Sequence, residues 1–144
     1  MSSDLLDSVA ELCARRPLDQ NAVEDLFDVA LRQDESNTNP YITKLLAFRR
    51  PPEIKAVEVR VPAAQATRKG PIVILDLDPE HVQLGQAQVK ARFGDKPTLD
   101  VPTPRQPPDS PIYLNYKQSW GTLRFGFARP KTELLTTIVV DADK

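Results

Sequence analysis

Two stretches at the start of the chain repeat apolar residues with the spacing of an amphipathic helix. Residues 3–16 place their apolar positions on one stripe, and Pro17 follows as a stop signal. Residues 20–33 repeat the same spacing, and Asn21 with Glu24 resembles a capping box. Both stretches carry acidic residues opposite the apolar stripe. The pattern therefore predicts two helices that each pack one side onto another layer.

Beyond residue 50 the chain alternates apolar and polar residues, as strands do. Ile54–Val61 alternates clearly, and Pro71–Leu77 is a nearly continuous apolar run that predicts a central, buried strand. The same reasoning predicts three more strands near the C-terminus, at 112–117, 123–128 and 134–141. Turns at 119–121 and 129–131 join them. Most of the chain after the two helices is therefore expected to form a sheet.

Three segments are less clear-cut in their pattern. Pro40–Phe48 fits either a short helix that begins at the proline or a strand, and we favour the strand because the residues after it also alternate. Residues 81–94 fit either a strand or a weakly amphipathic helix. We favour the helix, because Gly94 and Pro97 are typical of a helix C-terminus. Residues 95–111 contain six prolines and predict a stiff loop.

The order of elements in the C-terminal half resembles a known fold. It comprises a helix that ends at Gly94, a strand with Tyr113 and Tyr116, a Trp120-Gly121 turn, a strand with Phe125 and Phe127, and a last apolar strand. This order resembles the repeat unit of the β-lactamase-inhibitor-protein-like fold, which the outer-membrane lipoprotein family SmpA/OmlA shares. Residues 20–78 read as a divergent first copy with a helix, a loop and three strands.

The resemblance implies two tandem helix-plus-β-meander units in a non-enzymatic scaffold that binds proteins through its sheet surface. A role in outer-membrane assembly is not implied, because the signal peptide and lipidated cysteine of those lipoproteins have no counterpart here. We expect an α+β fold with N-terminal helices packed on an antiparallel sheet. The 144 residues fit a single domain over 1–144, with 1–80 and 81–144 as candidate subunits.

Composition adds a cellular location to this picture. Cys13 is the only cysteine, so an intramolecular disulfide is excluded and a cysteine-based metal site is disfavoured. Residues 1–16 contain acids and no continuous apolar run, which argues against a signal peptide. No stretch approaches the roughly 18 apolar residues that cross a bilayer. We therefore expect a cytoplasmic protein with no membrane partner.

Charge is unevenly distributed, although the formal net charge is only −1. Residues 1–39 are acidic, and set Asp4, Asp7, Glu11, Asp19, Glu24, Asp25, Asp28, Asp34 and Glu35 against three arginines. Residues 40–70 are basic, and set Lys44, Arg49, Arg50, Lys55, Arg60, Arg68 and Lys69 against two glutamates. The two regions either attract each other inside the fold or present differently charged faces to a partner.

One cluster has the residue types of a metal-dependent active site. It comprises Asp76, Asp78, Glu80 and His81, at the end of a predicted strand. Carboxylates on one face of a strand end, beside an imidazole, are able to bind Mg²⁺ or Mn²⁺. The simpler interpretation is a polar strand end that turns the chain. His81 is the only histidine, so no site can use two histidines, and the five scattered glycines form no phosphate-binding loop. We therefore expect no catalytic residues, metal or cofactor. A small metal-dependent enzyme that uses the cluster is the alternative.

Nucleic-acid binding is a second alternative. The basic segment 44–69 could contact phosphates. Strand faces with Lys55, Arg60 and Arg124 could also carry Tyr113 or Tyr116 as a platform on which bases stack. The chain as a whole is slightly acidic and has no RNA-binding signature, and both observations argue against this function.

Protein binding is the function that we favour from the sequence. Few residues of the chain form a recognisable catalytic pattern. The proline-rich segment 101–108 is stiff, so ordering it on binding costs less entropy. Tyr, Trp and Arg are enriched at interface hot spots. On this basis the candidate contact residues are Arg49, Arg50, Arg60, Arg105, Tyr113, Tyr116, Trp120 and Arg124. The most concrete version is a bacterial immunity protein that binds and neutralises a toxin or effector, and a general adaptor is the other version.

Overall fold

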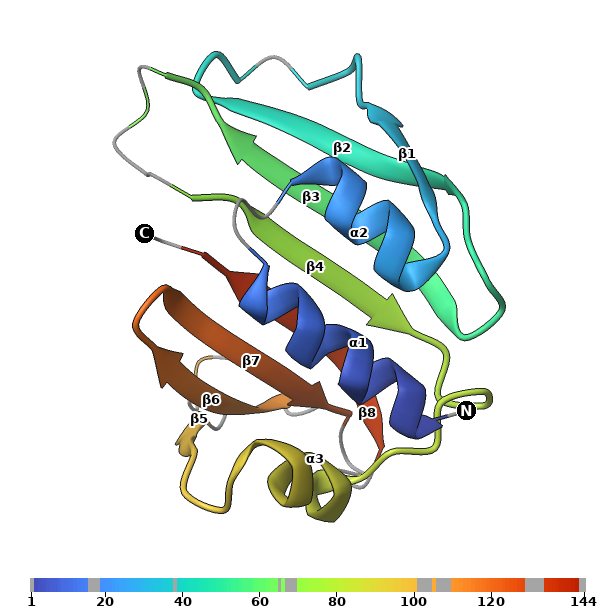
Figure 1. The fold of residues 1–144 in the computed structure, drawn as a ribbon, viewed down its shortest axis with the longest axis vertical. Helices are drawn as coiled ribbons and strands as arrows, with labels where there is room; N and C mark the ends of the chain where they lie inside the picture. The colour runs from blue at the N-terminus through green and yellow to red at the C-terminus, as the bar shows by residue number, and fades with distance from the viewer. Residues whose placement is uncertain are drawn as a thin grey trace.

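A continuous antiparallel sheet forms the centre of the molecule. The computed structural model describes residues 2–15, 19–37, 39–64, 66, 70–100, 105, 110–128 and 134–142. Within these ranges the elements are α1 (Ser2–Ala14), α2 (Gln20–Phe27), β1 (Ala30–Gln33), β2 (Ile42–Arg49), β3 (Ile54–Pro62), β4 (Ile72–Leu77), α3 (Gln86–Phe93), β5 (Thr98–Asp100), β6 (Ile112–Gln118), β7 (Gly121–Phe127) and β8 (Leu135–Asp141). The strand order is β1-β2-β3-β4-β8-β7-β6-β5 (Figure 1).

The sheet consists of two four-stranded meanders that meet at their last strands. Strands β1 to β4 follow one another across the first half, and β5 to β8 do so across the second. The halves join where β4 pairs with β8, with Ile74 opposite Val139. A helix precedes each meander, α2 in the first half and α3 in the second. The predicted α+β class with N-terminal helices and an antiparallel sheet is confirmed.

Both edge strands, β1 and β5, are absent from the elements predicted from the sequence. Residues 30–33 were expected to continue the second helix, and residues 98–100 were expected to lie in a loop. Each strand is short and pairs on one side only, β1 with β2 and β5 with β6. Their sequences carry little local β signal, so strand formation depends on the neighbour that supplies the hydrogen bonds.

The early end of α2 has a local cause. Asp28 adopts the left-handed conformation, with φ of 55°, which Asp tolerates better than most residues. The Glu24 carboxylate then accepts a hydrogen bond of 2.8 Å from the Leu31 N–H, and the Gln20 amide donates to the Leu31 carbonyl. Side chains of α2 thus bind the outer edge of β1. The N-cap of α2 is Asp19, which accepts from the Ala22 N–H at 3.0 Å, and not the predicted Asn21 and Glu24 pair.

The two ambiguous segments adopt the structures that we favoured. Residues 42–49 form strand β2, and residues 86–93 form helix α3. Gly94 ends α3 with φ of 118°, a conformation that favours glycine. The predicted turn at 129–131, and all of the proline-rich segment 101–108 except Arg105, lie outside the described residues.

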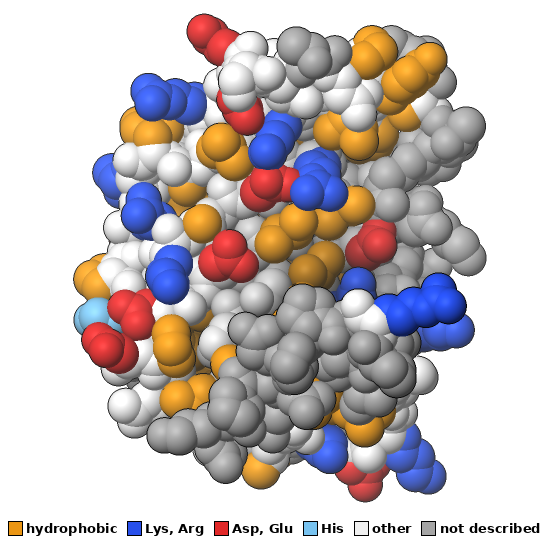
Figure 2. Space-filling view, turned by 180° about the vertical axis from the view of Figure 1, so that it is seen from behind, with side chains coloured by type: hydrophobic (Ala, Val, Ile, Leu, Met, Phe, Trp, Pro, Cys, Tyr) orange, Lys and Arg blue, Asp and Glu red, His pale blue; other side chains and the backbone are white. Residues whose placement is uncertain are grey.

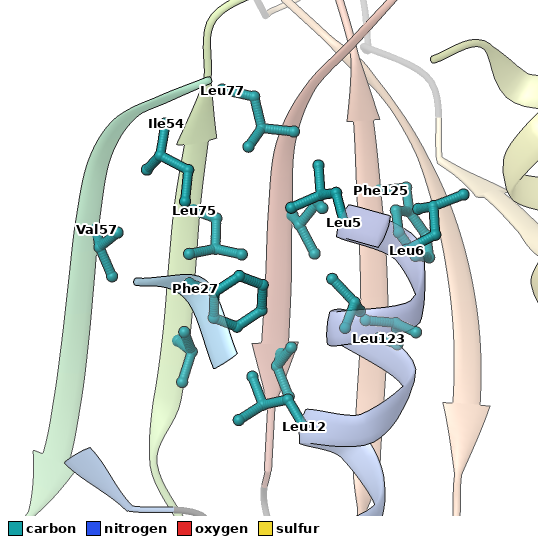
Figure 3. Packing of buried hydrophobic residues seen from close by; sticks show 14 of the residues in the cluster. Leu5, Leu6, Leu12, Phe27, Ile54, Val57, Leu75, Leu77, Leu123 and Phe125 are labelled. Carbon is teal, nitrogen blue, oxygen red and sulfur yellow. The ribbon is translucent and has the colours of Figure 1, made fainter. Parts of the chain in front are cut away.

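The helices cover only one face of the sheet. In Figure 1, α1 and α2 lie in front of the sheet, with α1 running nearly parallel to β4, and α3 lies near β5 and β6. Figure 3 shows Leu5, Leu6 and Leu12 of α1 and Phe27 of α2 directed at the sheet. The inward positions of the strands are apolar, among them Ile54, Val57, Val59, Val73, Leu75, Leu77, Leu114, Leu123, Phe125, Phe127, Leu135, Ile138 and Val140. Together these side chains form a single hydrophobic core.

An aromatic group anchors α3 to the second half of the sheet. The ring of Phe93 lies 5.0 Å from that of Phe125 and 6.1 Å from that of Tyr116, measured between centroids. The Tyr116 hydroxyl donates a 2.7 Å hydrogen bond to the Gly94 carbonyl. This bond satisfies the polar end of a ring that is otherwise in the core.

A matched pair of phenylalanines tests this assignment of the core. Phe125 is 0% exposed and Phe48 is 54% exposed. We expect Phe125→Ala to lower the free energy of unfolding by about 3–5 kcal/mol, because it leaves a cavity in the core. The same change at Phe48 should cost less than about 1 kcal/mol. Urea unfolding followed by circular dichroism measures both values, and equal losses would contradict the assignment.

Candidate functional site

The sheet face opposite α1 and α2 is the candidate functional surface, and we name it the open face. Paired residues of antiparallel strands share a face, so the register identifies its members. They include Arg32, Lys44, Leu46, Phe48, Ala56, Glu58, Arg60, Ile72, Ile74, Asp76, Tyr113, Asn115, Thr122, Arg124, Thr137, Val139 and Asp141. Figure 2 shows hydrophobic side chains interleaved with charged ones on this side of the molecule.

Two arginines of the open face stack on aromatic rings. The Arg32 guanidinium carbon lies 5.1 Å from the centroid of the Phe48 ring. The Arg124 guanidinium carbon lies 4.5 Å from the centroid of Tyr113, and the Arg124 Nε donates a 2.9 Å hydrogen bond to the Asn115 side chain. These contacts hold both arginines in defined positions on the surface.

The position of Tyr113 depends on the glycine opposite it. A Cβ atom at Gly126 would lie 2.8 Å from Cε1 of Tyr113 and 3.2 Å from its Cζ. The ring therefore lies close over the backbone of β7, in space that only a glycine leaves open. Sequence reasoning did not single out Gly126, although a glycine inside a strand pattern is a signal of close approach.

Ion pairs link the strands of the open face near its first edge. Glu58 pairs with Lys44 at 3.4 Å and also with Arg60, and Lys44 lies 3.9 Å from Asp34. Pairs at a surface contribute little to stability, about 0–1 kcal/mol each. They place charged side chains beside the exposed Leu46, which pairs with Glu58 across the strands.

The charge asymmetry of the sequence corresponds to the layers of the fold. The acidic region 1–39 supplies α1 and α2, where Asp7, Glu11 and Asp25 are exposed on the outside of the helix layer. The basic region supplies β2 and β3. The two sides of the molecule thus present different charges. Among the described residues, direct pairs between the regions include Arg49 with Asp28 at 3.6 Å and Lys44 with Asp34 at 3.9 Å.

The structure separates the contact residues predicted from the sequence into several places. Arg60, Tyr113 and Arg124 lie on the open face. Arg49 ends β2 and Arg50 follows it in the turn to β3. Arg105 is exposed, and nothing in the described ranges brings it to the others.

Two of the predicted contact residues belong to the core instead. Tyr116 faces the helices and is only 7% exposed, so it supports α3 and is not available to a partner. Trp120 is partly buried against the core. Three open-face residues, Arg32, Leu46 and Phe48, were not predicted from the sequence. A signal was present in β2, which has apolar residues on both faces, with Leu45 directed inward and Leu46 and Phe48 directed outward.

The cluster at residues 76–81 forms a turn. The Asp78 carboxylate accepts hydrogen bonds from the Glu80 N–H at 3.0 Å and from the His81 ring at 2.9 Å. These two bonds lower the pKa of Asp78, the Glu80 bond most. The Asp76 side chain is exposed on the open face, but the protein around its carboxyl group partly desolvates it and raises its pKa. Within the described ranges, no three His, Cys, Asp or Glu side chains converge as a metal site would require.

Comparisons with known proteins add nothing to this geometry. No protein-family model, no curated protein and no solved structure matches the chain. Among the helices that the structure describes, none has the length and apolar character needed to cross a membrane.

Substitution of Gly126 tests the link between β7 and the Tyr113 ring. We expect Gly126→Ala to lower the free energy of unfolding by about 1–3 kcal/mol, because the new methyl group collides with that ring. Most of this loss should disappear in a Tyr113→Ala background. A double-mutant cycle from urea denaturation measures the coupling. Additive losses would mean that the collision is not the cause.

Two carboxylates should shift acid stability in opposite directions. The folded state lowers the pKa of Asp78, so its ionised carboxylate stabilises the fold at pH values above the pKa that it has in the unfolded chain. This stabilisation is lost as the pH falls through the lower pKa of the folded state, below about 4. Asp78→Asn should therefore reduce stability at pH 7, and the stability of this variant should fall less than that of the wild-type chain as the pH is lowered. The folded state raises the pKa of Asp76, so Asp76→Asn should increase stability at pH 7.

Thermal unfolding between pH 3 and pH 7 measures both effects. Each asparagine variant is the control for the other, since both remove one negative charge from the end of β4 or the turn after it. Changes of the same sign at pH 7 would contradict the assignment.

Proposed function

We propose that this chain is a protein-binding module that uses the open face of its sheet, and most concretely a bacterial immunity protein that binds and neutralises a toxin or effector. The observation that carries the proposal is the pairing of arginines with aromatic rings on a face that no described helix covers. Phe48, half exposed, carries Arg32, and Tyr113 carries Arg124. Aromatic residues and arginine are the side chains that most often dominate interface energies.

Pre-organisation supports binding at this face. Arg124 is fixed by both the Tyr113 ring and the Asn115 side chain before any partner arrives. Immobilising a long side chain on association costs about 0.5–1.5 kcal/mol, so an arginine already held in place loses less. A rigid sheet also presents these groups with little backbone rearrangement.

The size of the sheet is adequate for a specific complex. Strands lie about 4.8 Å apart and are typically about 20 Å long, so eight of them span roughly 700–800 Å². A standard interface takes about 800 Å² from each partner. The doubled helix-plus-meander arrangement also supports the proposal, because the fold that the sequence resembles binds proteins through its sheet.

Charge favours a protein over a nucleic acid as the partner. The bases of the open face share rows of the sheet with carboxylates. Glu58 lies in the row of Arg32 and Arg124, and Asp141 lies in the row of Lys44 and Arg60. A phosphate backbone requires a continuous basic track, which these carboxylates interrupt. A protein surface is able to match both signs.

Co-expression with a toxin encoded beside this gene tests the proposal. We expect the chain to restore growth and to form a complex with the purified toxin in calorimetry. Phe48→Asp should weaken that complex about tenfold or more, which corresponds to about 1.4 kcal/mol. Leu99→Asp is the matched control, because Leu99 is 57% exposed at the opposite edge of the sheet.

The outcomes separate clearly. Growth arrest by the toxin in the presence of the wild-type chain, with no complex formed, would refute neutralisation. Equal affinity of the Phe48→Asp and wild-type chains would show that the open face is not the contact surface.

A further inference from the structure

Two shallow hollows meet at Phe48, the most exposed hydrophobic residue of the open face. The first, of about 680 Å³, follows β1 and β2 and is lined by Arg32, Asp34, Glu35, Leu46 and Phe48 among others. The second, of about 560 Å³, follows the turn from β2 to β3 and is lined by Phe48, Arg49, Arg50, Pro51, Lys55 and Asp78 among others. The Phe48 ring is a wall of both.

The two hollows have opposite charge. The hollow at the β2–β3 turn contains three cations, Arg49, Arg50 and Lys55, and a single carboxylate, Asp78, which already accepts bonds from Glu80 and His81. The ion pair of Arg49 with Asp28 joins two side chains that are more than half exposed, so water and salt screen it. This hollow is therefore electropositive.

The hollow along β1 contains two carboxylates and one cation. Hydrogen bonds from the Ser36 hydroxyl, at 2.6 Å, and from its N–H lower the pKa of Asp34 and keep it ionised. Lys44 also lies 3.9 Å from Asp34 and offsets part of its charge. Glu35 adds a second negative charge, while Arg32 is stacked on Phe48. Among the residues that line this hollow, two carboxylates face one cation, so its lining is net negative, whereas three cations face one carboxylate in the hollow at the turn.

We infer that the partner docks here through a protein segment with an ordered charge pattern: an acidic block over the β2–β3 turn, an apolar side chain on Phe48, and a basic block beside Asp34 and Glu35. The inference rests on the proposed function, and it specifies the chemistry of the partner at that face. The turn contains Pro51 and Pro52, which have no N–H to donate. Recognition at the turn therefore depends on side chains and not on addition of a strand.

Opposite charges on the two sides of one apolar anchor also select a direction. A segment in the reverse orientation would place like charges in both hollows, and like-charge contacts oppose association at an interface. A nucleic acid is disfavoured for the same reason, because its phosphates would meet Asp34 and Glu35.

Two synthetic peptides of identical composition test the inference. The block peptide has acidic residues, then a Leu-Phe pair, then basic residues, and the alternating peptide mixes the two charges on both sides of the same pair. Each is titrated into the ¹⁵N-labelled full chain at low salt and followed by NMR. We expect the block peptide to shift the amide signals of residues 32–36, 46–50 and 53–55 and to bind about tenfold more tightly than the alternating peptide.

Variants of the full chain show whether charge order is the cause. The double change Arg49→Glu with Arg50→Glu should remove the preference for the block peptide, and Phe48→Ala should weaken both peptides. The matched change of Arg60→Glu, also on the open face but outside both hollows, should leave the preference intact.

The inference is wrong if the two peptides bind equally, if neither binds at millimolar concentration, or if the shifts map to α1 and α2. These results are independent of the toxin experiment. A chain that neutralises a toxin through Phe48 but shows no preference between the peptides would retain the proposed function and lose the charge order. A chain that prefers the block peptide but neutralises no toxin would support the charge order and contradict the proposed neutralisation.

Discussion

Burial of one face of the sheet under α1 and α2 is the constraint on which the rest of the structure depends. An antiparallel sheet is stable with a single covered face, because its other face is able to meet water. Val9 and Leu12 of α1, with Val23 of α2, are fully buried and take the apolar side chains of both meanders out of water. Since β4 pairs with β8 beneath them, the two halves share one core.

Covering one face also determines what the other face carries. Alternation along each strand sends one set of residues to the core and the other to the open face. Glu58 and Arg60 therefore project outward from β3, where Val57 and Val59 project inward. The acidic helix layer and the more basic sheet lie on opposite sides of the molecule, so a partner meets a different charge on each side. Protein binding is proposed at the side where Arg32 and Arg124 are held on aromatic rings.

Prediction from the sequence succeeded where the local signal was strong and failed where neighbours decided. Strands with clear alternation, and the helix that ends at Gly94, were recognised from pattern alone. The edge strand at 30–33 was read as helix, because its Leu31 continued the helical spacing. Its strand conformation depends on the turn at Asp28 and on pairing with β2. Of the contact residues predicted from the sequence, Arg60, Tyr113 and Arg124 lie on the open face, whereas Tyr116 lies in the core.

The sequence by itself determined the α+β class, most of the strands, and the separation of acidic and basic regions, because these follow from spacing and composition within short windows. Only the tertiary structure decided which residues share the open face, since strands far apart in the chain become neighbours through their pairing. The stacking of Tyr113 over Gly126, and the hollows of opposite charge on the two sides of Phe48, both arise from such pairing. A glycine inside a strand pattern signals that some group approaches closely, but the register between strands decides that this group is Tyr113.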